Sequence, residues 1–306
     1  MKRKIMALML IGSLGASPAM ALYDATFWGT RALGMGGAFV SVSDDANAPA
    51  YNIAGTGEME KAEITFMSAK IFSGLDGLDM STDYFAFVYP ISRKAGSISV
   101  GWSYFGDAGL RREDSVNLGY ARELDDVIGE LDWMSLMAGV NLRYLRQEVR
   151  YKGDTLDKSA FAFDIGILAR FKYGISVGYS GRYFNRPDIG FKSEDRIKQT
   201  NVIGLSYYSE ELPLLKIPYF TIAMDYEMRE GENNLLLGAE SLVLNGDLAL
   251  RMGGWREQLN FGVGYGFDFG KEESKSRLTI DYTFGLPLEI QDSTGNHFVS
   301  LTFRFP

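Results

Sequence analysis

Residues 260–270 read NFGVGYGFDFG, and large and small residues alternate along this stretch. In a β-strand successive side chains point to opposite faces of the sheet, so one face here is bulky and the other slight. The bulky face carries Phe261, Val263, Tyr265, Phe267 and Phe269. The slight face carries Asn260, Gly262, Gly264, Gly266 and Asp268. A strand with lipid on one side and a confined, wet or filled interior on the other is expected to show this pattern.

The same alternation recurs through most of the chain from residue 61 onward. The alternating runs are separated by clusters of Gly, Asp, Asn, Ser and Pro, which are typical of turns. We expect strands at residues 61–72, 83–90, 96–105, 115–124, 131–149, 158–171, 174–184, 198–209, 218–229, 234–244, 247–256, 258–270, 276–284 and 296–305. This pattern predicts an all-β fold, a closed antiparallel transmembrane β-barrel of about 14 strands. An even number of strands returns both ends of the barrel to the same side of the membrane.

The polar faces of these strands carry charges of both signs. They include Arg143, Asp164, Arg170, Arg182, Asp225, Glu227, Glu240, Arg251, Asp268, Asp281 and Arg304. A dry protein core could not hold so many ionised groups, whereas a bore that contains water or a polar segment could. The competing interpretation, a large soluble β-sandwich, would place the apolar faces of two sheets against each other. Closure in lipid explains the pattern better, because lipid requires every backbone polar group to be paired within the protein.

The N-terminal residues 1–21 have the features of a cleaved signal peptide. Lys2, Arg3 and Lys4 precede an apolar run, and Ala19-Met20-Ala21 supplies a small-residue cleavage pattern. The apolar run is shorter than the roughly 20 residues that a membrane helix requires. After cleavage 28 of the 31 basic residues would face 39 acidic residues, a net charge of −11, which argues against nucleic acid as a partner. The chain contains no cysteine, so disulfides and lipid attachment at a cysteine are excluded.

The links between the expected strands agree only partly with an outer-membrane orientation. Such barrels have short periplasmic turns and longer extracellular loops. If residue 61 begins on the periplasmic side, the links at 185–196 and 285–296 are long outer loops. The link at 209–219, however, is a long inner connection, and residues 254–258 form a tight outer turn.

Residues 22–60 precede the first strand and do not alternate. Within them, RALGMGGAFVSVSDDANAPAYNIAG (31–55) resembles the N-terminal hatch of the long-chain fatty acid transporter superfamily. That superfamily includes FadL-type transporters and PorV/PorQ-type outer-membrane proteins, and residues 82–124 and 281–305 look closest to the PorV/PorQ type. Ile53 stands where the family pattern usually has proline. The hatch residues proposed on this resemblance are Gly34, Gly36, Gly37, Asp44, Asp45, Asn47, Asn52 and Gly55.

The resemblance implies three parts: a signal peptide (1–21), a hatch or plug inside the bore (22–60) and an outer-membrane barrel (61–306) in a Gram-negative cell. Small residues would let the plug pack closely against the wall. Asp44, Asp45 and Asn47 could pair with luminal arginines such as Arg143, Arg170 or Arg182. The Asp44-Asp45 pair could equally well cap turns.

Catalytic and cofactor motifs are weak. The runs GMGG (34–37) and GVGYG (262–266) lack the strand–helix context of a dinucleotide-binding loop, and Asp44-Asp45 lacks the spaced ligands of a calcium loop. His297 is the only histidine, and Ser300, three residues along the same expected strand, points to the opposite face. We therefore expect no enzyme activity, no cofactor and no metal site.

Two functions remain open. The first is a plugged transporter of hydrophobic small molecules, with an apolar pocket near the outer mouth. Its candidate lining residues are Leu75, Leu78, Ile189, Phe191, Leu286, Leu288 and Ile290. The second is a PorV/PorQ-like structural or docking component of protein secretion. The expected partners are outer-membrane lipid, a hydrophobic ligand in the first case and a secretion-system protein in the second. The shortness of the chain favours transport slightly.

Overall fold

The computed structural model describes residues 28–306 except 78, 108, 130, 152, 213–216, 272–273 and 291. The expected signal peptide, residues 1–21, lies outside the described residues. No helix in the described part of the chain has the length and apolar character needed to cross a membrane.

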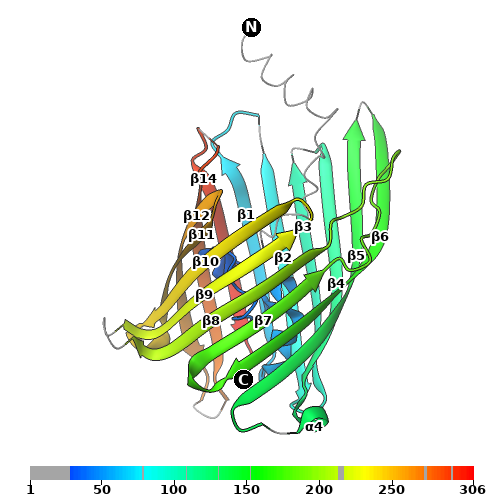
Figure 1. The fold of residues 1–306 in the computed structure, drawn as a ribbon. Helices are drawn as coiled ribbons and strands as arrows, with labels where there is room; N and C mark the ends of the chain where they lie inside the picture. The colour runs from blue at the N-terminus through cyan, green and yellow to red at the C-terminus, as the bar shows by residue number, and fades with distance from the viewer. Residues whose placement is uncertain are drawn as a thin grey trace.

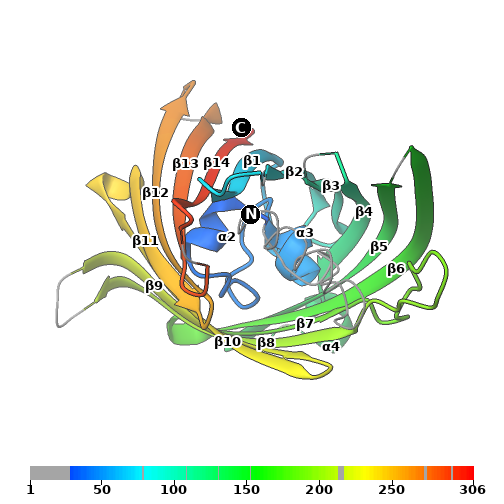
Figure 2. The same ribbon diagram turned by 90° about the horizontal axis from the view of Figure 1, so that it is seen from above.

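Fourteen strands form a closed antiparallel barrel, in which each strand pairs with its neighbours in sequence and β1 pairs with β14 (Figures 1 and 2). The first seven are β1 (Glu63–Ser73), β2 (Met80–Ser92), β3 (Gly96–Asp107), β4 (Arg111–Glu123), β5 (Met134–Tyr151), β6 (Asp154–Phe171) and β7 (Ile175–Arg182). The others are β8 (Thr200–Leu212), β9 (Ile217–Arg229), β10 (Glu232–Val243), β11 (Leu248–Trp255), β12 (Gln258–Phe269), β13 (Ser276–Pro287) and β14 (Gly295–Arg304). The predicted closed barrel and its fourteen strands are confirmed.

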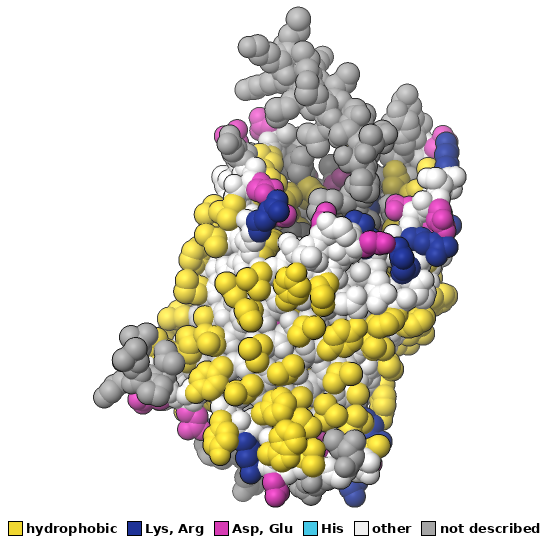
Figure 3. All heavy atoms as spheres, viewed as in Figure 1, with side chains coloured by type: hydrophobic (Ala, Val, Ile, Leu, Met, Phe, Trp, Pro, Cys, Tyr) yellow, Lys and Arg dark blue, Asp and Glu magenta, His cyan; other side chains and the backbone are white. Residues whose placement is uncertain are grey.

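The alternation in β12 separates the outside of the barrel from its interior. The Phe261 side chain is 50% exposed, whereas its neighbour Asn260 is fully buried. The outward row continues across the wall, since Phe261 lies opposite Met252 of β11 and Phe284 of β13. Hydrophobic side chains cover the barrel face seen in Figure 3, between charged side chains above and below. This apolar band is the surface that faces hydrocarbon.

Several strands extend beyond their predicted limits. We call the end of the barrel that carries Glu63 and Arg304 the inner end, and the opposite end the outer end. β5 and β6 pair from Met134–Phe171 at the inner end to Tyr151–Asp154 at the outer end. β2 continues through Pro90, and its register with β3 shifts between Pro90 and Ser92. Proline lacks an N–H, so it fits a strand where a bulge interrupts the ladder.

The longest connection between strands is the loop at residues 183–199. Residues 183–199 join β7 to β8 at the outer end, and β4 and β5 are joined at the inner end by a segment containing the short helix α4 (Asp125–Ile128). The long inner link expected at residues 209–219 is shorter, because β8 continues to Leu212 and β9 begins at Ile217. The expected outer loop at 285–296 shortens for the same reason, since β13 reaches Pro287.

The wall is interrupted between β6 and β7. Within the described residues β7 pairs with β6 only from Ile165 to Arg170, although β6 pairs with β5 along its whole length. Beyond this point Tyr183, with φ of 57°, turns the chain out of β7. The following residues bond to β6 instead: the Phe184 N–H donates to the Phe163 carbonyl (3.1 Å), and Asn185 Nδ2 donates to the Phe161 carbonyl (2.7 Å).

Candidate functional site within the barrel

The luminal segment, residues 28–60, lies inside the barrel (Figure 2). It contains the helix α2 (Thr30–Gly34), the helix α3 (Ala48–Tyr51) and the 3₁₀ helix η3 (Ile53–Glu58). Almost all of its residues up to 57 are buried. Six of the thirteen residues between α2 and α3 are Ala, Gly or Ser, which lets the backbone approach the wall closely.

Inward-facing glycines of the wall mark the path of the luminal segment. A Cβ on Gly238 would lie 2.2 Å from the Met35 carbonyl oxygen, and one on Gly178 would lie 2.4 Å from that of Val40. A Cβ on Gly262 would lie 3.1 Å from the Gly34 Cα. Real Cβ atoms do not approach main-chain oxygens so closely. On β12, Gly262 therefore leaves room for the backbone of the luminal segment at Gly34.

Glycines of the luminal segment make the reciprocal contacts. Gly36 has φ of 64°, which favours glycine, and a Cβ there would lie 2.0 Å from the Gly254 nitrogen. Gly37, with φ of 76°, lies beside the Leu236 side chain. A Cβ on Gly55 would lie 1.7 Å from the Ser43 carbonyl oxygen, so Gly55 permits contact within the segment itself.

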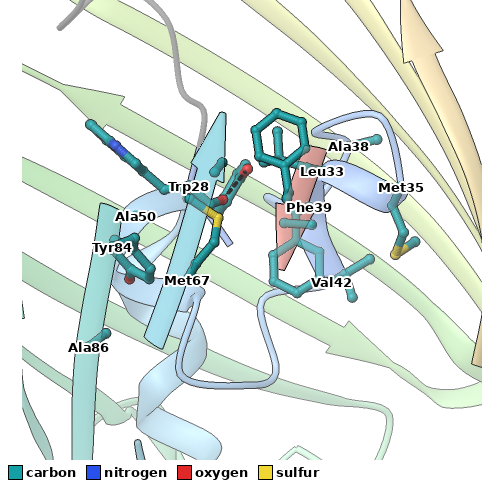
Figure 4. Packing of buried hydrophobic residues seen from close by; sticks show 14 of the residues in the cluster. Trp28, Leu33, Met35, Ala38, Phe39, Val42, Ala50, Met67, Tyr84 and Ala86 are labelled. Atoms are coloured by element: carbon teal, nitrogen blue, oxygen red, sulfur yellow. Dashed lines mark hydrogen bonds between the residues drawn. The ribbon is translucent and has the colours of Figure 1, made fainter. Parts of the chain in front are cut away.

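An apolar cluster joins the luminal segment to the inner face of β1, β2 and β14 (Figure 4). The largest fully buried members are Phe39, Phe298, Leu33, Met35 and Met67. The rings of Phe39 and Tyr51 meet edge to face, with centroids 5.4 Å apart. Burial of each large side chain contributes about 1.5–3 kcal/mol, so this cluster holds the segment in place strongly.

Arg31 is the centre of an ionic network between the luminal segment and the wall. Its guanidinium donates to Glu240 (2.7 and 2.9 Å), to Asp45 (2.9 Å) and to Asp44 (2.6 Å). On the wall, Arg251 donates to Glu240 (2.6 Å) and to Asp281 of β13 (2.6 Å). Burial alone would lower the pKa of Arg31, but the carboxylates of Asp44, Glu240 and Asp45 outweigh burial and raise it. Arg31 is therefore charged and paired.

A second ionic contact holds the end of the luminal segment. Arg170 of β6 pairs with Glu58 and donates to the carbonyl oxygens of Ser41 (2.9 Å) and Val42 (2.6 Å). Burial raises the pKa of the Glu58 carboxyl, and the Arg170 guanidinium opposes that shift. One wall arginine thus binds two parts of the segment that are separated in sequence.

Wall side chains also satisfy backbone groups of the luminal segment. Asp225 Oδ2 accepts the N–H groups of Phe39 and Val40, both at 2.8 Å. A side chain of the luminal segment also bonds to the wall. Asn52 Nδ2 donates to the carbonyl oxygen of Ile167 in β6 (3.0 Å) and to that of Val40 in the same segment (2.9 Å). Buried backbone groups that are not in regular structure require such partners.

The remaining predicted luminal charges pair with one another across the wall. Arg143 pairs with Asp164 and also donates to the Pro49 carbonyl oxygen at 3.3 Å. Arg182 pairs with Glu227 at 2.7 Å. Asp268, predicted with the same set, pairs with Arg277 at 2.8 Å near the inner rim, and its side chain is 44% exposed.

The expected partners of Asp44 and Asp45 are corrected by the structure. Arg143, Arg170 and Arg182 pair instead with Asp164, Glu58 and Glu227, as described above. Asp44 and Asp45 both pair with Arg31 of the luminal segment. Asp45 also caps a turn, since its Oδ1 accepts the Asn47 N–H at 2.8 Å, so the turn-capping interpretation applies as well.

Sequence reasoning missed three site residues, Arg31, Glu58 and Glu63. Glu63, the first residue of β1, is fully buried and accepts the Ala46 N–H (2.8 Å) and a hydrogen bond from Arg304 (2.8 Å). Arg31 begins the Gly- and Ala-rich run, where an isolated charge is an available signal, whereas Glu58 is followed closely by Glu60 and Lys61. The wall partners of Arg31 and Glu58 lie on distant strands, which no local pattern reveals.

Comparison with known proteins identifies the fold. No protein-family model and no curated protein matches the sequence. A solved Pseudomonas aeruginosa FadL homologue matches with 11% identity and a TM-score of 0.57, over 90% of this chain and 97% of that chain. A TodX monoaromatic hydrocarbon channel with a deltaS2S3 mutation matches with 11% identity and a TM-score of 0.61, over 92% and 99%. The fold is similar to that of FadL-type channels.

The FadL-type fold contains a small polar cavity toward its inner end. Its volume is about 240 Å³, and Arg31, Asp44, Glu63, Asp247 and Arg277 are among its lining residues. In the part of the chain that the structure describes, no group of three or more His, Asp or Glu side chains is arranged to hold a metal ion. The cavity is a polar space bounded by paired charges.

Toward the outer end, the FadL-type barrel encloses an apolar cluster. Leu145, Ala162, Tyr183, Ile189 and Ile197 pack together where the 183–199 loop meets the inner face of β5 and β6. Of the residues expected to line an outer pocket, Ile189 is thus buried, while Leu286, Leu288 and Ile290 are exposed. Leu75 and Phe191 are half-buried, and Leu78 lies outside the described residues.

The only histidine of the chain faces away from the interior of this fold. His297 Nδ1 and the Tyr282 hydroxyl lie 2.8 Å apart, and the Phe284 ring is also next to the imidazole. Ser300 is buried on the opposite, inward face. These two residues therefore do not form a nucleophile–base pair.

Proposed function

We propose that this chain is an outer-membrane transporter of hydrophobic small molecules, in which the luminal segment acts as a plug. The similarity to a FadL homologue and to a monoaromatic hydrocarbon channel supports the proposal at the level of the fold. The outward apolar band agrees with a location in the outer membrane, reached through the expected signal peptide. The plug residues would be the hatch residues predicted from the sequence, together with Arg31 and Glu58.

The observation that carries this proposal is the filled bore. Backbone contacts at Gly36 and Gly238, and the ionic contacts of Arg31 and Arg170, fix the luminal segment on several sides of the wall. A general diffusion porin needs an open aqueous channel, and this interior does not provide one. A filled bore suits solutes that partition into apolar sites better than freely diffusing ions.

The apolar outer cluster suggests where such a solute would first bind. Ile189 and Tyr183 bring the 183–199 loop against the inner wall at the height where β6 lacks its β7 partner. Phe184 and Asn185 bond to the backbone of β6 there. We assign the entry site for the hydrophobic solute to this region.

Uptake measurements test the proposal. Cells lacking the gene, and cells complemented with it, are given a labelled monoaromatic hydrocarbon or a labelled long-chain fatty acid. Faster uptake of one of them in complemented cells is expected, and Ile189→Asp should reduce it, because a charge in an apolar site binds such solutes poorly. Leu288→Asp, at an exposed position, is the matched control and should keep normal uptake.

The PorV/PorQ-like docking role remains the alternative, and the same cells separate the two. If uptake does not depend on the gene but the export of other proteins does, the transporter proposal is wrong and docking is favoured. Removal of residues 28–60 adds a second readout. A plug predicts that this deletion lets small polar solutes pass, whereas unchanged permeability would contradict a plugging role.

A further inference from the structure

An apolar groove of about 840 Å³ crosses the lipid-facing surface of β7–β12. It lies between two rows of outward side chains that follow the strand register. One row consists of Ile175, Tyr207, Ile222, Ala239, Met252 and Phe261, which are successive partners on neighbouring strands. The second row consists of Leu205, Met224, Leu237, Gly254 and Leu259, again partner to partner. The groove is therefore built by the register of the sheet.

The floor of the groove is strand backbone. The inward-facing row between the two outer rows includes Ala223, Gly238 and Gly253, whose side chains add nothing to the outer surface. On the inner side of this floor, a Cβ on Gly238 or Gly253 would lie 2.2 or 2.3 Å from main-chain atoms of Met35. The wall is thus in backbone contact with the luminal segment directly behind the groove.

Two small residues widen the groove on its outer side. Ala239 and Gly254 stand in rows whose other members are Leu, Ile, Met, Tyr or Phe. Ala239 lies opposite Met252 and Ile222, and Gly254 lies opposite Leu237 and Leu259. Neither row contains a charged residue, and their exposed members are part of the apolar band.

The groove has the length and direction of a lipid chain. Its lining spans six strands, and strands lie about 4.8 Å apart, so it is about 24 Å long. A row that crosses strands tilted by about 45° covers about 17 Å of membrane depth, close to the half of a hydrocarbon core about 30 Å thick that one acyl chain spans. Strands β7–β10 are strongly tilted in Figure 1, so a groove that runs across them is steep. An unfilled groove at this depth would forfeit dispersion contacts along its whole lining.

We propose that this groove is a binding site for one acyl chain of a membrane lipid. The bound chain and the luminal segment contact opposite sides of the same glycine-containing backbone row. The site is distinct from the bore and does not depend on the transport proposal.

Photochemical cross-linking tests the site. The protein is reconstituted in phosphatidylcholine vesicles that contain a phospholipid with a diazirine on its acyl chain, and labelled peptides are identified by mass spectrometry. Labelling of the groove rows should exceed that of the lipid-facing residues of β4 and β5 several-fold. Ala239→Leu fills the groove from the lipid side and should abolish the excess. Ala138→Leu makes the same change on the lipid-facing side of β5 and should leave the excess intact.

A folding check and a second groove variant complete the test. Folding of each variant is checked by the different gel mobility of the unheated and the heated barrel. Met252→Ala lowers one side of the groove without adding bulk and should also reduce the excess labelling. Equal labelling of both walls, or an unchanged excess in folded Ala239→Leu, would overturn the proposal. So would protein–protein cross-links through the groove, which would assign it to a second copy of the chain.

Discussion

At the scale of single residues, the glycines of the wall record where the luminal segment lies. Gly262 is one of three glycines on the inward face of the NFGVGYGFDFG stretch, and it faces Gly34. The neighbouring Gly264 instead leaves room for Asp281 and the Arg251 guanidinium. The sequence indicated a confined interior but could not show which glycine meets backbone and which meets an ion pair.

Gly238 provides a direct test of the backbone contact. Gly238→Ala adds a methyl group 2.2 Å from the Met35 carbonyl oxygen, which cannot move away without shifting the segment. We expect a loss of about 1–3 kcal/mol in the free energy of unfolding, because overpacking strains both backbones. Ala239→Val, one residue along and facing lipid, is the control. Urea unfolding of the vesicle-bound barrel, followed by tryptophan fluorescence, measures both variants, and equal stabilities would contradict the contact.

Arg31 shows what local patterns cannot reveal. Its partner Glu240 lies 209 positions away in sequence, so only the closed barrel brings the two together. The alternation did place Glu240 on an inward face, but the sequence assigned the aspartates of the hatch to other arginines.

Arg31→Met should be strongly destabilising. It would leave the carboxylates of Glu240 and Asp45, both buried, without one of their partners. Removal of one member of a buried ionic network costs about 3–5 kcal/mol. Arg256→Met, which breaks an exposed 3.7 Å contact with Glu289, should change the stability by less than about 1 kcal/mol. Similar losses for the two variants in urea unfolding would show that the Arg31 network does not stabilise the fold.

At the scale of elements, the sequence predicted every strand but not every strand end. The period of two persists only while one face meets lipid, and β4, β5 and β6 continue beyond the apolar band at the outer end. There both faces are polar, so Arg112, Arg146 and Asp157 gave no alternation to follow. The early end of β7 at Arg182 had no local signal either, because it follows from the turn at Tyr183.

The 183–199 loop offers a pH test at this scale. The backbone N–H groups of Asp195 and Gly190 lower the pKa of the Asp188 carboxyl, whose Oδ1 accepts both at 2.9 and 3.0 Å. A lowered pKa means that the ionised form orders the loop. This contribution is complete above the unfolded pKa of about 3.9 and is lost as pH falls through the lower folded value.

A nitroxide on Lys192→Cys measures the order of this loop, because the chain has no other cysteine. Its mobility should be low at neutral pH and should rise as the pH falls below about 4. In Asp188→Asn the mobility should be high and independent of pH. A label that is equally mobile at every pH in both proteins would show that Asp188 does not order the loop.

At the scale of the whole molecule, the fold depends on two surfaces of one sheet. The outer surface is large and apolar because it meets hydrocarbon, and the inner surface is small or charged because it meets the luminal segment. The plug proposal assigns the luminal segment to the inner surface of the wall, and the groove proposal assigns an acyl chain to the outer surface. Both proposals therefore require this arrangement.

The most direct measurement is a cysteine scan of β9 in lipid vesicles, in which a nitroxide is placed at each residue from Phe220 to Tyr226 in turn. Collision with oxygen, which concentrates in hydrocarbon, should be frequent at Ile222, Met224 and Tyr226 and rare at Ala223 and Asp225. Labels without this alternation, or with oxygen access greatest at Ala223 and Asp225, would contradict a barrel whose apolar face meets the membrane.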